Sequence, residues 1–560
     1  MSLKGSFVPT PKFVEVSISE NLQKEKGFHN LQTYHPGMAL LCNLKEAPKR
    51  DIWLDHAQRV IATEGGSPKR SLPLTLRVEK NSEQRGLEVE DVSGFRKITH
   101  LLDPVSWLQG KYSVPKETLL PGHQETWGAL NTKLQDPMNQ AYIEALATYC
   151  FSKLREGDFT PHFHKFYGAF CCVADTYSYN ITDSYMSYRN RRWFWDAQEK
   201  KLFTVGFEDE DIPEEVRNAV LEKPDEYYDS SDEEEDDNKE ESSTEELEDL
   251  SCDNETGSLH SAHCSEMKTV DSESDELEDD ETDEKDELNL YAEIHKFPVM
   301  TLYTEFSEGT MDDLLDDFDE VGARPGTEGW NLRWKAWVFQ VIAALCVGQS
   351  VFGFTHNDLH SNNIVWTKTD KEYLYYSCRD GLHFRVPTFG KIFRLIDFGR
   401  AIFRVNSTQF FSDDFRAGND AAEQFNFGEL YDPDEPEVPP NPSFDLSRFT
   451  VSVFEGIFPS SPPIVKKPAV LSQEKGLKML QTECDLYNVM WTWLLCDDGH
   501  NVLMEPDGKE RYPDFDLYKV IAAEVHDAIP AQQIKKSLFE CFRTKKKSIP
   551  EGTKVYSLFC

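Results

Sequence analysis

Apolar side chains recur every three or four positions in two parts of the chain. Residues 139–154 show this spacing clearly, and residues 331–353 form a longer and almost continuously apolar run. The spacing predicts a helix in each place. The apolar stretch from Ala336 to Phe354 is nearly long enough to cross a membrane, but it contains Gln340 and Gln349 and leads directly into the most polar motif of the chain. We therefore expect a helix buried in the protein core rather than a membrane span.

Strands are indicated by short runs in which apolar and polar residues alternate, or in which β-branched and aromatic residues gather. Residues 72–78 alternate in this way, and residues 87–89 follow after a polar turn, which predicts a β-hairpin. Further strands are expected in residues 163–172, 299–304, 364–366, 373–376, 384–386 and 391–396, and a further helix in residues 445–457. Both kinds of element are therefore expected on either side of the most polar part of the chain.

Charge is distributed very unevenly along the 560 residues, whose formal net charge is −41. Residues 208–287 contain 37 acidic and 5 basic residues, a net charge of −32, so the rest of the chain carries only −9. This segment has almost no large apolar side chains and cannot bury enough surface to become ordered. We expect a disordered acidic insertion over about residues 205–290 that interrupts a domain. Because no broad basic face is visible, we expect no direct binding of nucleic acid.

The twelve cysteines are scattered, with no Cys-x-x-Cys pair and no finger-like spacing of Cys and His. This distribution fits a reducing compartment, and we expect no structural zinc site. The first residues contain no apolar run suited to a signal peptide. The protein is accordingly expected inside the cell, in the cytoplasm or the nucleus, without a membrane partner.

The strongest chemical signal is the run from His356 to Asn363, followed further on by Asp397-Phe-Gly. Transfer of a phosphoryl group requires a base that accepts the proton of the attacking hydroxyl, and Mg²⁺ that neutralises charge on the phosphate oxygens. Asp358 is suited to be the base. Asn363, five residues later, and Asp397 carry the oxygen ligands that Mg²⁺ prefers. The spacing matches the catalytic-loop and Asp-Phe-Gly patterns of kinases.

On these motifs the chain resembles the protein-kinase-like superfamily over about residues 100–540. The run Val386-Pro-Thr-Phe-Gly390 makes it most similar to the divergent kinases of large DNA viruses of protists. The resemblance implies an α+β, bilobal fold with a mainly β N-lobe, which holds the acidic insertion, and a mainly α C-lobe. It assigns residues 1–98 to a partly ordered N-terminal region, 99–300 to the N-lobe, 301–545 to the C-lobe and 546–560 to a tail. It also adds the virion as a location.

The resemblance also implies an adenine site and a structural anchor. Thr304 would be the gatekeeper at the end of its strand, and the backbone groups of Glu305 and Ser307 would pair with adenine. Asp445 would bind the backbone of the catalytic loop, although its position also suits the N-cap of the helix that follows. Asn357 stands where many protein kinases have an arginine that binds a phosphorylated loop, so regulation by loop phosphorylation is not expected.

The phosphate clamp is less clearly marked in the sequence. Glu144, on the helix predicted before residues 163–172, matches the helix glutamate of the family. Its partner should be a lysine on a preceding strand, for which we choose Lys133, with Lys111 as the rival. No Gly-x-Gly-x-x-Gly motif is present to cover the phosphates.

The resulting expectation is an ATP- and Mg²⁺-dependent kinase that phosphorylates Ser/Thr residues of a protein substrate. Two alternatives stay open. Asp358-Leu-His360 is typical of kinases that act on small molecules, and the missing glycine motif would suit a pseudokinase scaffold. In the scaffold alternative, the acidic insertion would bind a basic protein partner.

Overall fold

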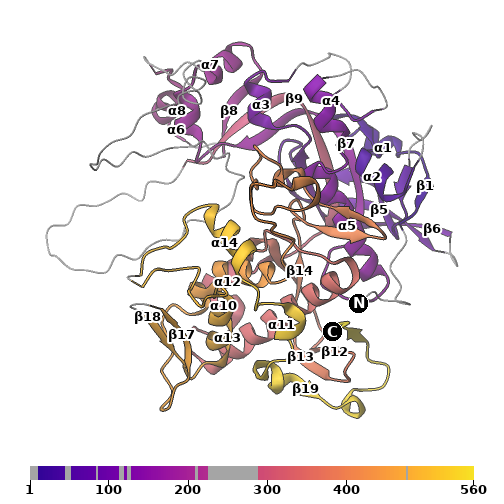
Figure 1. The fold of residues 1–560 in the computed structure, drawn as a ribbon. Helices are drawn as coiled ribbons and strands as arrows, with labels where there is room; N and C mark the ends of the chain where they lie inside the picture. Colours follow the sequence, from indigo (N-terminus) through magenta and orange to yellow (C-terminus); the bar gives the residue numbers. More distant parts are fainter. Residues whose placement is uncertain are drawn as a thin grey trace, which may run out of the picture.

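The computed structural model describes residues 11–44, 52–82, 86–112, 119–122, 128–208, 212–224, 288–474, 477–506 and 508–560. Most of the expected acidic insertion, residues 225–287, lies outside the described residues, so its expected disorder stays a prediction. The expectation is wrong for its first residues, because residues 205–207 belong to strand β8 (Phe203–Phe207) and residues 214–221 form helix α8 (Glu214–Leu221). Within the described residues the protein is a mixed α+β structure, as expected. Up to residue 305 more residues lie in strands than in helices, and after it more residues lie in helices than in strands (Figure 1).

A large antiparallel sheet forms the first part of the structure, with the strand order β2-β7-β9-β6-β5-β4, and β8 pairs with β9 beside it. Its strands are β2 (Phe28–Gln32), β4 (Gln58–Glu64), β5 (Leu72–Ser82), β6 (Gly86–His100), β7 (Phe166–Asn180), β8 (Phe203–Phe207) and β9 (Leu290–Glu305). The predicted hairpin is confirmed as β5 and β6. The boundary that we expected after residue 98 falls inside β6, so the residues before it contribute strands to the same sheet.

The helix predicted at residues 139–154 is α5 (Gln140–Glu156). The side chain of Asn139 accepts a hydrogen bond from the N–H of Ala141 and caps its first turn, as is usual at helix N-termini. Nearly all of α5 is buried, and it packs in the main core together with residues of β7 and β9. The sheet has a second, smaller apolar cluster formed by side chains of the N-terminal segment and of β4, β5, β7 and β9.

The long apolar run is α11 (Glu328–Phe352), which begins at the N-cap Thr327 and ends at Gly353, whose φ of 58° a glycine adopts without strain. It is the one helix among the described residues that is long and apolar enough to cross a membrane, but most of it is buried in the protein. Gln340 lies on its buried face. Its amide bonds the backbone of two residues of strand β14, Lys391 and Phe393. The helix is therefore a core helix, as predicted, and it fixes the strand that leads to Asp397.

Three further sheets and a set of helices complete the second part of the structure. The sheets have the orders β10-β11-β14, β19-β13-β12-β20 and β17-β18, and a hairpin β15-β16 lies apart. Their strands are β10 (Gly309–Thr310), β11 (Ile364–Lys368), β12 (Tyr373–Ser377), β13 (His383–Pro387), β14 (Lys391–Leu395), β15 (Phe403–Val405), β16 (Thr408–Phe410), β17 (Val470–Glu474), β18 (Leu477–Leu480), β19 (Arg543–Thr544) and β20 (Val555–Ser557). The helices are α9 (Asp313–Asp316), α10 (Phe318–Val321), α12 (Phe444–Ile457), α13 (Asp485–Trp493), α14 (Asp516–Glu524) and α15 (Pro530–Gln533).

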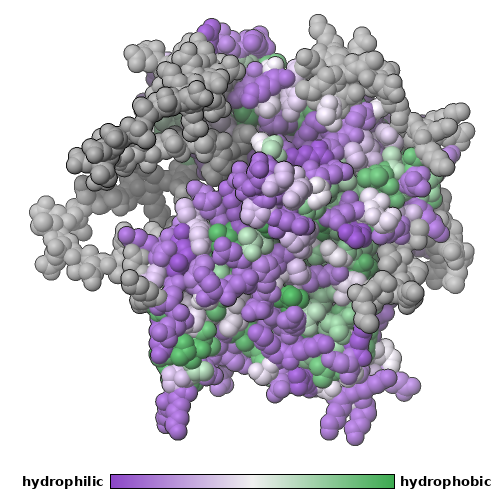
Figure 2. Space-filling view, viewed as in Figure 1, coloured by the Kyte–Doolittle hydropathy of each residue, from purple (hydrophilic) through white to green (hydrophobic). Residues whose placement is uncertain are grey.

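The remaining elements lie in the first part of the chain. They are β1 (Phe13–Glu15), α1 (Glu20–Gln23), α2 (Pro36–Leu41), β3 (Ile52–Leu54), α3 (Pro104–Leu108), α4 (Gly128–Gln135), α6 (Tyr185–Arg189), α7 (Arg192–Glu199) and α8 (Glu214–Leu221). In the view of Figure 2, hydrophilic side chains cover most of the described surface, and apolar ones appear in separate patches.

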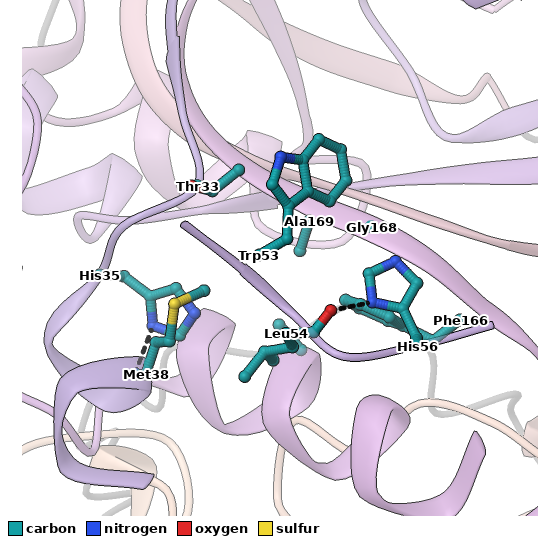
Figure 3. Close-up of a pocket in the computed structure, with 10 residues that line it drawn as sticks. Thr33, His35, Met38, Trp53, Leu54, His56, Phe166, Gly168 and Ala169 are labelled. Atoms are coloured by element: carbon teal, nitrogen blue, oxygen red, sulfur yellow. Dashed lines mark hydrogen bonds between the residues drawn. The ribbon is translucent and has the colours of Figure 1, made fainter. Parts of the chain in front are cut away.

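Buried histidines occur in several places of this fold. His35 and His56 line a cavity of about 10 Å³ beside α5, where Nδ1 of His35 accepts a hydrogen bond from the N–H of Met38 (Figure 3). His162 donates to Phe393 O and also bonds the hydroxyl of Tyr376. Burial lowers the pKa of His35 and of His162 to about 3 each, so both rings are neutral at pH 7.

We expect these histidines to make the protein unstable in mild acid. Burial also lowers the pKa of His164 to about 3, whereas an unfolded histidine titrates near 6.5. Below that pH the unfolded chain binds protons that the folded chain does not, so stability falls as the pH falls. His35, His162 and His164 each contribute a slope of about 1.4 kcal/mol per pH unit. His56 and His100, whose pKa burial lowers to about 4, each contribute slightly less. Asp414, whose pKa burial raises to about 7, contributes the same slope with the opposite sign.

Chemical denaturation at pH 5.5 and 4.5 should therefore show a loss of about 5 kcal/mol in the free energy of unfolding. The variant His162→Gln tests the assignment, because it should reduce the pH dependence by roughly one histidine's share. A free energy of unfolding that is flat over this range would contradict the prediction.

Candidate active site

The loop from residue 356 to residue 363 is hydrogen-bonded to the first turn of helix α12. The carboxylate of Asp445 accepts hydrogen bonds from the N–H of His356, at 2.9 and 3.0 Å, and of Asn357, at 3.0 Å. Burial raises the pKa of Asp445, while these backbone donors oppose the rise. Ser443, not Asp445, occupies the N-cap position of α12. The expected bond between Asp445 and the loop backbone is therefore confirmed.

Strand β14 brings Asp397 against this loop. The N–H of Ile396 donates to Asn363 O at 3.1 Å, and the ring of His356 donates from Nε2 to Ile396 O at 2.8 Å. Asp397 itself has a φ of 63°, the left-handed region that non-glycine residues enter only where the surroundings hold them. Ile396 is therefore hydrogen-bonded to both ends of the loop, and Asp397 is the next residue in the chain.

Asp358 and Asn363 lie at the two ends of the same turn. The amide of Asn363 donates to Asp358 O at 2.9 Å and also contacts Nε2 of His360 at 3.0 Å. One carboxylate oxygen of Asp358 accepts a hydrogen bond from the hydroxyl of Tyr518 on α14, at 2.8 Å. Burial raises the pKa of Asp358, but the charge of Arg400 is the largest of several opposing effects, and the net shift is downward. Asp358 is therefore ionised at neutral pH.

The lysine that pairs with Glu144 is Lys97, so the expected pairing with Lys133 is wrong. Lys97 lies on β6, and its Nζ is 2.7 Å from Oε1 of Glu144 and 2.8 Å from Oδ2 of Asp397. Thr99 donates to the other oxygen of Glu144 at 3.3 Å. One ammonium group thus connects the sheet, helix α5 and Asp397, the second residue after β14.

The charges of this cluster shift one another's titration. Burial raises the pKa of Asp397, but the neighbouring Lys97 outweighs that effect and holds it at about 2. Burial lowers the pKa of Lys97, but the carboxylates of Asp397 and Glu144 raise it above its ordinary value. Burial is the largest effect on Glu144 and raises its pKa. The Asp397 side chain is 42% exposed, so its carboxylate is accessible to a ligand.

Lys133 and Lys111 lie elsewhere. Lys133 is on helix α4, not on a strand, and its ammonium binds the carboxylate of Asp413 in the segment after Asp397. Asp413 also accepts a hydrogen bond from the N–H of Gln140, the first residue of α5, at 2.9 Å. Lys111 is exposed at the end of the turn after α3. A carboxylate of the chain itself therefore connects the segment after Asp397 to the start of α5.

Two expected adenine-site residues come at the end of β9 and the third just after it. Thr304 is nearly buried and pairs with Phe95 on β6. The carboxylate of Glu305 binds Arg155 and lies 3.5 Å from Arg394. Burial raises the pKa of Glu305, but Arg394 and Arg155 outweigh it and hold it at about 2.

The third residue, Ser307, shares a hydrogen bond of 2.8 Å with Nε2 of His164. The backbone N–H of Glu305 donates to Lys165 O. The carboxylate of Glu305 is therefore structural, and its N–H is already used within the protein.

A glycine pair in the loop between β4 and β5 was not singled out from the sequence. Gly65 and Gly66 have φ values of 88° and 83°. The space beside Gly65 is open, because a Cβ atom there would meet no atom within 4 Å apart from its chain neighbours. Ser71, at the end of the same loop, accepts a hydrogen bond from the N–H of Ile98, the neighbour of Lys97. The glycine loop thus joins β4 to β5, and β5 is the neighbour of the strand that carries Lys97. The signal in the sequence was a Gly-Gly pair ahead of the predicted hairpin.

The donor set of the site suits a hard cation. Asp397 offers an exposed carboxylate, and Asn363 is an amide from the adjacent turn. Carboxylate and amide oxygens are ligands that Mg²⁺ accepts, and Mg²⁺ is commonly bound by one or two protein groups together with substrate phosphates. The types of these two side chains therefore fit a magnesium ion.

Comparison with known proteins gives one partial match. No family model matches the chain. The chain is 33% identical over 103 residues to a probable serine/threonine-protein kinase of Dictyostelium discoideum, and the match covers 17% of the chain and 8% of that protein. This similarity indicates a relationship to protein kinases. The match spans less than a tenth of the length of that relative.

Proposed function

We propose that the protein is an ATP- and Mg²⁺-dependent protein kinase that transfers the γ-phosphoryl group of ATP to Ser/Thr hydroxyls of a protein substrate. In this proposal the large sheet with α5 is the N-lobe and the helical part is the C-lobe. The observation that carries it is the position of Lys97, which bonds Glu144 and Asp397 at once. In kinases, a lysine that is held by a helix glutamate binds the phosphates of the nucleotide close to the metal-binding aspartate. Lys97, Glu144 and Asp397 have the same arrangement.

The metal and the phosphates would be held by side chains from both parts of the protein. Asp397 and Asn363 would bind Mg²⁺, which when bound neutralises charge on the phosphate oxygens. Lys97 would hold the α- and β-phosphates, with Glu144 fixing its ammonium group. The loop that contains Gly65 and Gly66 would cover the phosphates with its backbone, as glycine allows a close approach.

Asp358 would orient the acceptor hydroxyl and take its proton. Its depressed pKa keeps it ionised, and Oδ1 already accepts a hydrogen bond from the hydroxyl of Tyr518. A substrate hydroxyl would make the same kind of bond, because a base must lie within hydrogen-bond distance of the proton that it receives. Arg400, which lowers the pKa of Asp358, would keep the carboxylate charged until that transfer.

The adenine ring would meet the chain after β9. Because the N–H of Glu305 is bonded to Lys165, the carbonyl of Glu305 is the group that we assign to adenine, together with the backbone of Ser307. Thr304 would close the back of this site. The Asp413 contacts with Lys133 and Gln140 would hold the segment after Asp397 in place without a phosphate group.

The alternatives make different predictions about transfer. The pseudokinase scaffold was motivated in part by the uncertain lysine, and Lys97 now fills that position. The small-molecule kinase rests on Asp358-Leu-His360, where His360 contacts Asn363. Capture of a basic protein by the acidic insertion would be compatible with each of the three functions.

The proposal is tested by incubating the purified chain with γ-labelled ATP, Mg²⁺ and a panel of proteins that includes basic ones. We expect label on Ser or Thr residues of a protein, and complete loss of it when EDTA removes the metal. Nucleotide binding with no transfer to any protein would favour the scaffold. Label that appears only in a pool of small metabolites would favour the small-molecule kinase.

A further inference from the structure

A group of potential metal ligands lies far from the proposed active-site residues in the sequence, around the turn that follows α13. One sulfur, one nitrogen and one oxygen ligand atom, from Cys496, His500 and Glu524, all lie within 4.8 Å of one another. Cys496 is buried, His500 is partly buried, and Glu524 is exposed at the end of α14. No other such group of three is found among the described residues.

The backbone explains why these side chains meet. Leu495 and Asn501 form an antiparallel bridge, and inside it the N–H of Cys496 donates to His500 O at 2.9 Å. Gly499, with a φ of 92°, allows the chain to reverse in so few residues. The N–H of Asp497 then donates to Glu524 O at 2.8 Å and attaches α14 to the turn. Three ligands from two segments are thus fixed by main-chain hydrogen bonds.

The groups around the ligands also favour a metal. A carboxylate oxygen of Asp498 bonds Nδ1 of His500, which places the proton on that nitrogen and leaves the lone pair on Nε2. The hydroxyl of Tyr512 lies 3.0 Å from Nε2.

We propose, contrary to the expectation from the cysteine spacing, that Cys496, His500 and Glu524 form a zinc site that fixes the C-terminal end of α14 to the turn after α13. A sulfur, an imidazole nitrogen and a carboxylate oxygen form a ligand set typical of Zn²⁺. In a tetrahedral zinc site the ligand atoms lie about 3.5 Å apart, so small side-chain rotations close the observed group. Zn²⁺ takes the place of the thiol proton, which is released to solvent, and a water or the Tyr512 hydroxyl completes the coordination.

Cobalt is the probe for this site, because a cysteine thiolate bound to Co²⁺ gives a charge-transfer absorption in the near ultraviolet. The purified full chain is freed of metal, kept reduced and titrated with Co²⁺. We expect one Co²⁺ per chain with this absorption, and its displacement by Zn²⁺. Cys496→Ser should abolish the absorption, whereas Cys541→Ser, at an exposed cysteine on a different segment, should leave it unchanged.

Two further variants keep the test decisive if Cys496→Ser does not fold. Glu524→Gln changes only an exposed ligand and should weaken Zn²⁺ binding at least tenfold, and Asp498→Asn should weaken it 10- to 100-fold through the orientation of His500. Zn²⁺ should also raise the unfolding temperature of the wild type and of Cys541→Ser, but much less that of Glu524→Gln. Absence of the thiolate absorption, or the same absorption in Cys496→Ser, would overturn the proposal. Neither readout depends on kinase activity.

Discussion

Replacing Asp397 by Asn should lower phosphoryl transfer about 10³-fold and leave the fold intact. The substitution removes the charge of a proposed metal ligand, and such a ligand contributes several kcal/mol of transition-state stabilisation, equivalent to about three powers of ten in rate. The Asp397 side chain is 42% exposed, and Lys97 keeps its second partner Glu144. The free energy of unfolding should therefore change by less than about 1 kcal/mol.

Two measurements check this prediction. Initial rates of labelled phosphate transfer give the loss of activity, and thermal unfolding with and without Mg-ATP gives the loss of nucleotide binding. Mg-ATP should raise the unfolding temperature of the wild type, but less that of the variant. Asp370→Asn, which removes an exposed carboxylate from the turn after β11, is the matched control and should behave as wild type. Transfer by Asp397→Asn at more than a tenth of the wild-type rate would remove Asp397 from the proposed metal site.

Replacing Lys97 by Met should lower transfer about 10²-fold or more, whereas Lys133→Met should lower it less than tenfold. Loss of one positioned charge next to a transferring group typically has an effect of 10²- to 10³-fold. Lys133 binds Asp413 and touches neither Glu144 nor Asp397. Its removal loosens the segment after Asp397 but leaves the proposed phosphate clamp complete.

The Lys97→Met variant also leaves the carboxylate of Glu144 buried without its cation. Because burial already raises the pKa of Glu144, we expect it to take up a proton, which limits the loss of stability. Adding Glu144→Gln to Lys97→Met should then restore stability but not transfer. Thermal unfolding followed by circular dichroism measures stability, and initial rates measure transfer. Both are compared for the wild type, Lys97→Met, Lys133→Met and the double variant Lys97→Met/Glu144→Gln. An equal loss of transfer in Lys133→Met and Lys97→Met would contradict the assignment.

Local patterns predicted most elements correctly. The helix at residues 139–154, the core helix at residues 331–353 and the strand at residues 391–396 are all present, because each has its own periodicity and buries one face or the whole element. The loop from His356 to Asn363 and the later Asp397 could also be recognised in the sequence. Their spacing matches the kinase pattern, and it depends only on a short turn and on the strand that leads to Asp397.

The lysine was missed for a physical reason. Lys97 meets Glu144 only because β6 lies between β9 and β5 in the sheet, and the order of strands is not encoded in the periodicity of any one strand. Lys133 was chosen as a strand residue, but its surroundings form the helix α4.

The sequence by itself determined the residue types of the site: the carboxylates of Asp358 and Asp397, the amide of Asn363, and the buried anchor Asp445, because each belongs to a short motif whose geometry follows from a few backbone angles. Only the tertiary structure decided which cation faces Glu144, and that Cys496 and His500, in the turn after α13, meet Glu524 at the end of α14. Those contacts depend on strand order and helix packing, which are set by the burial of apolar faces far from the residues concerned.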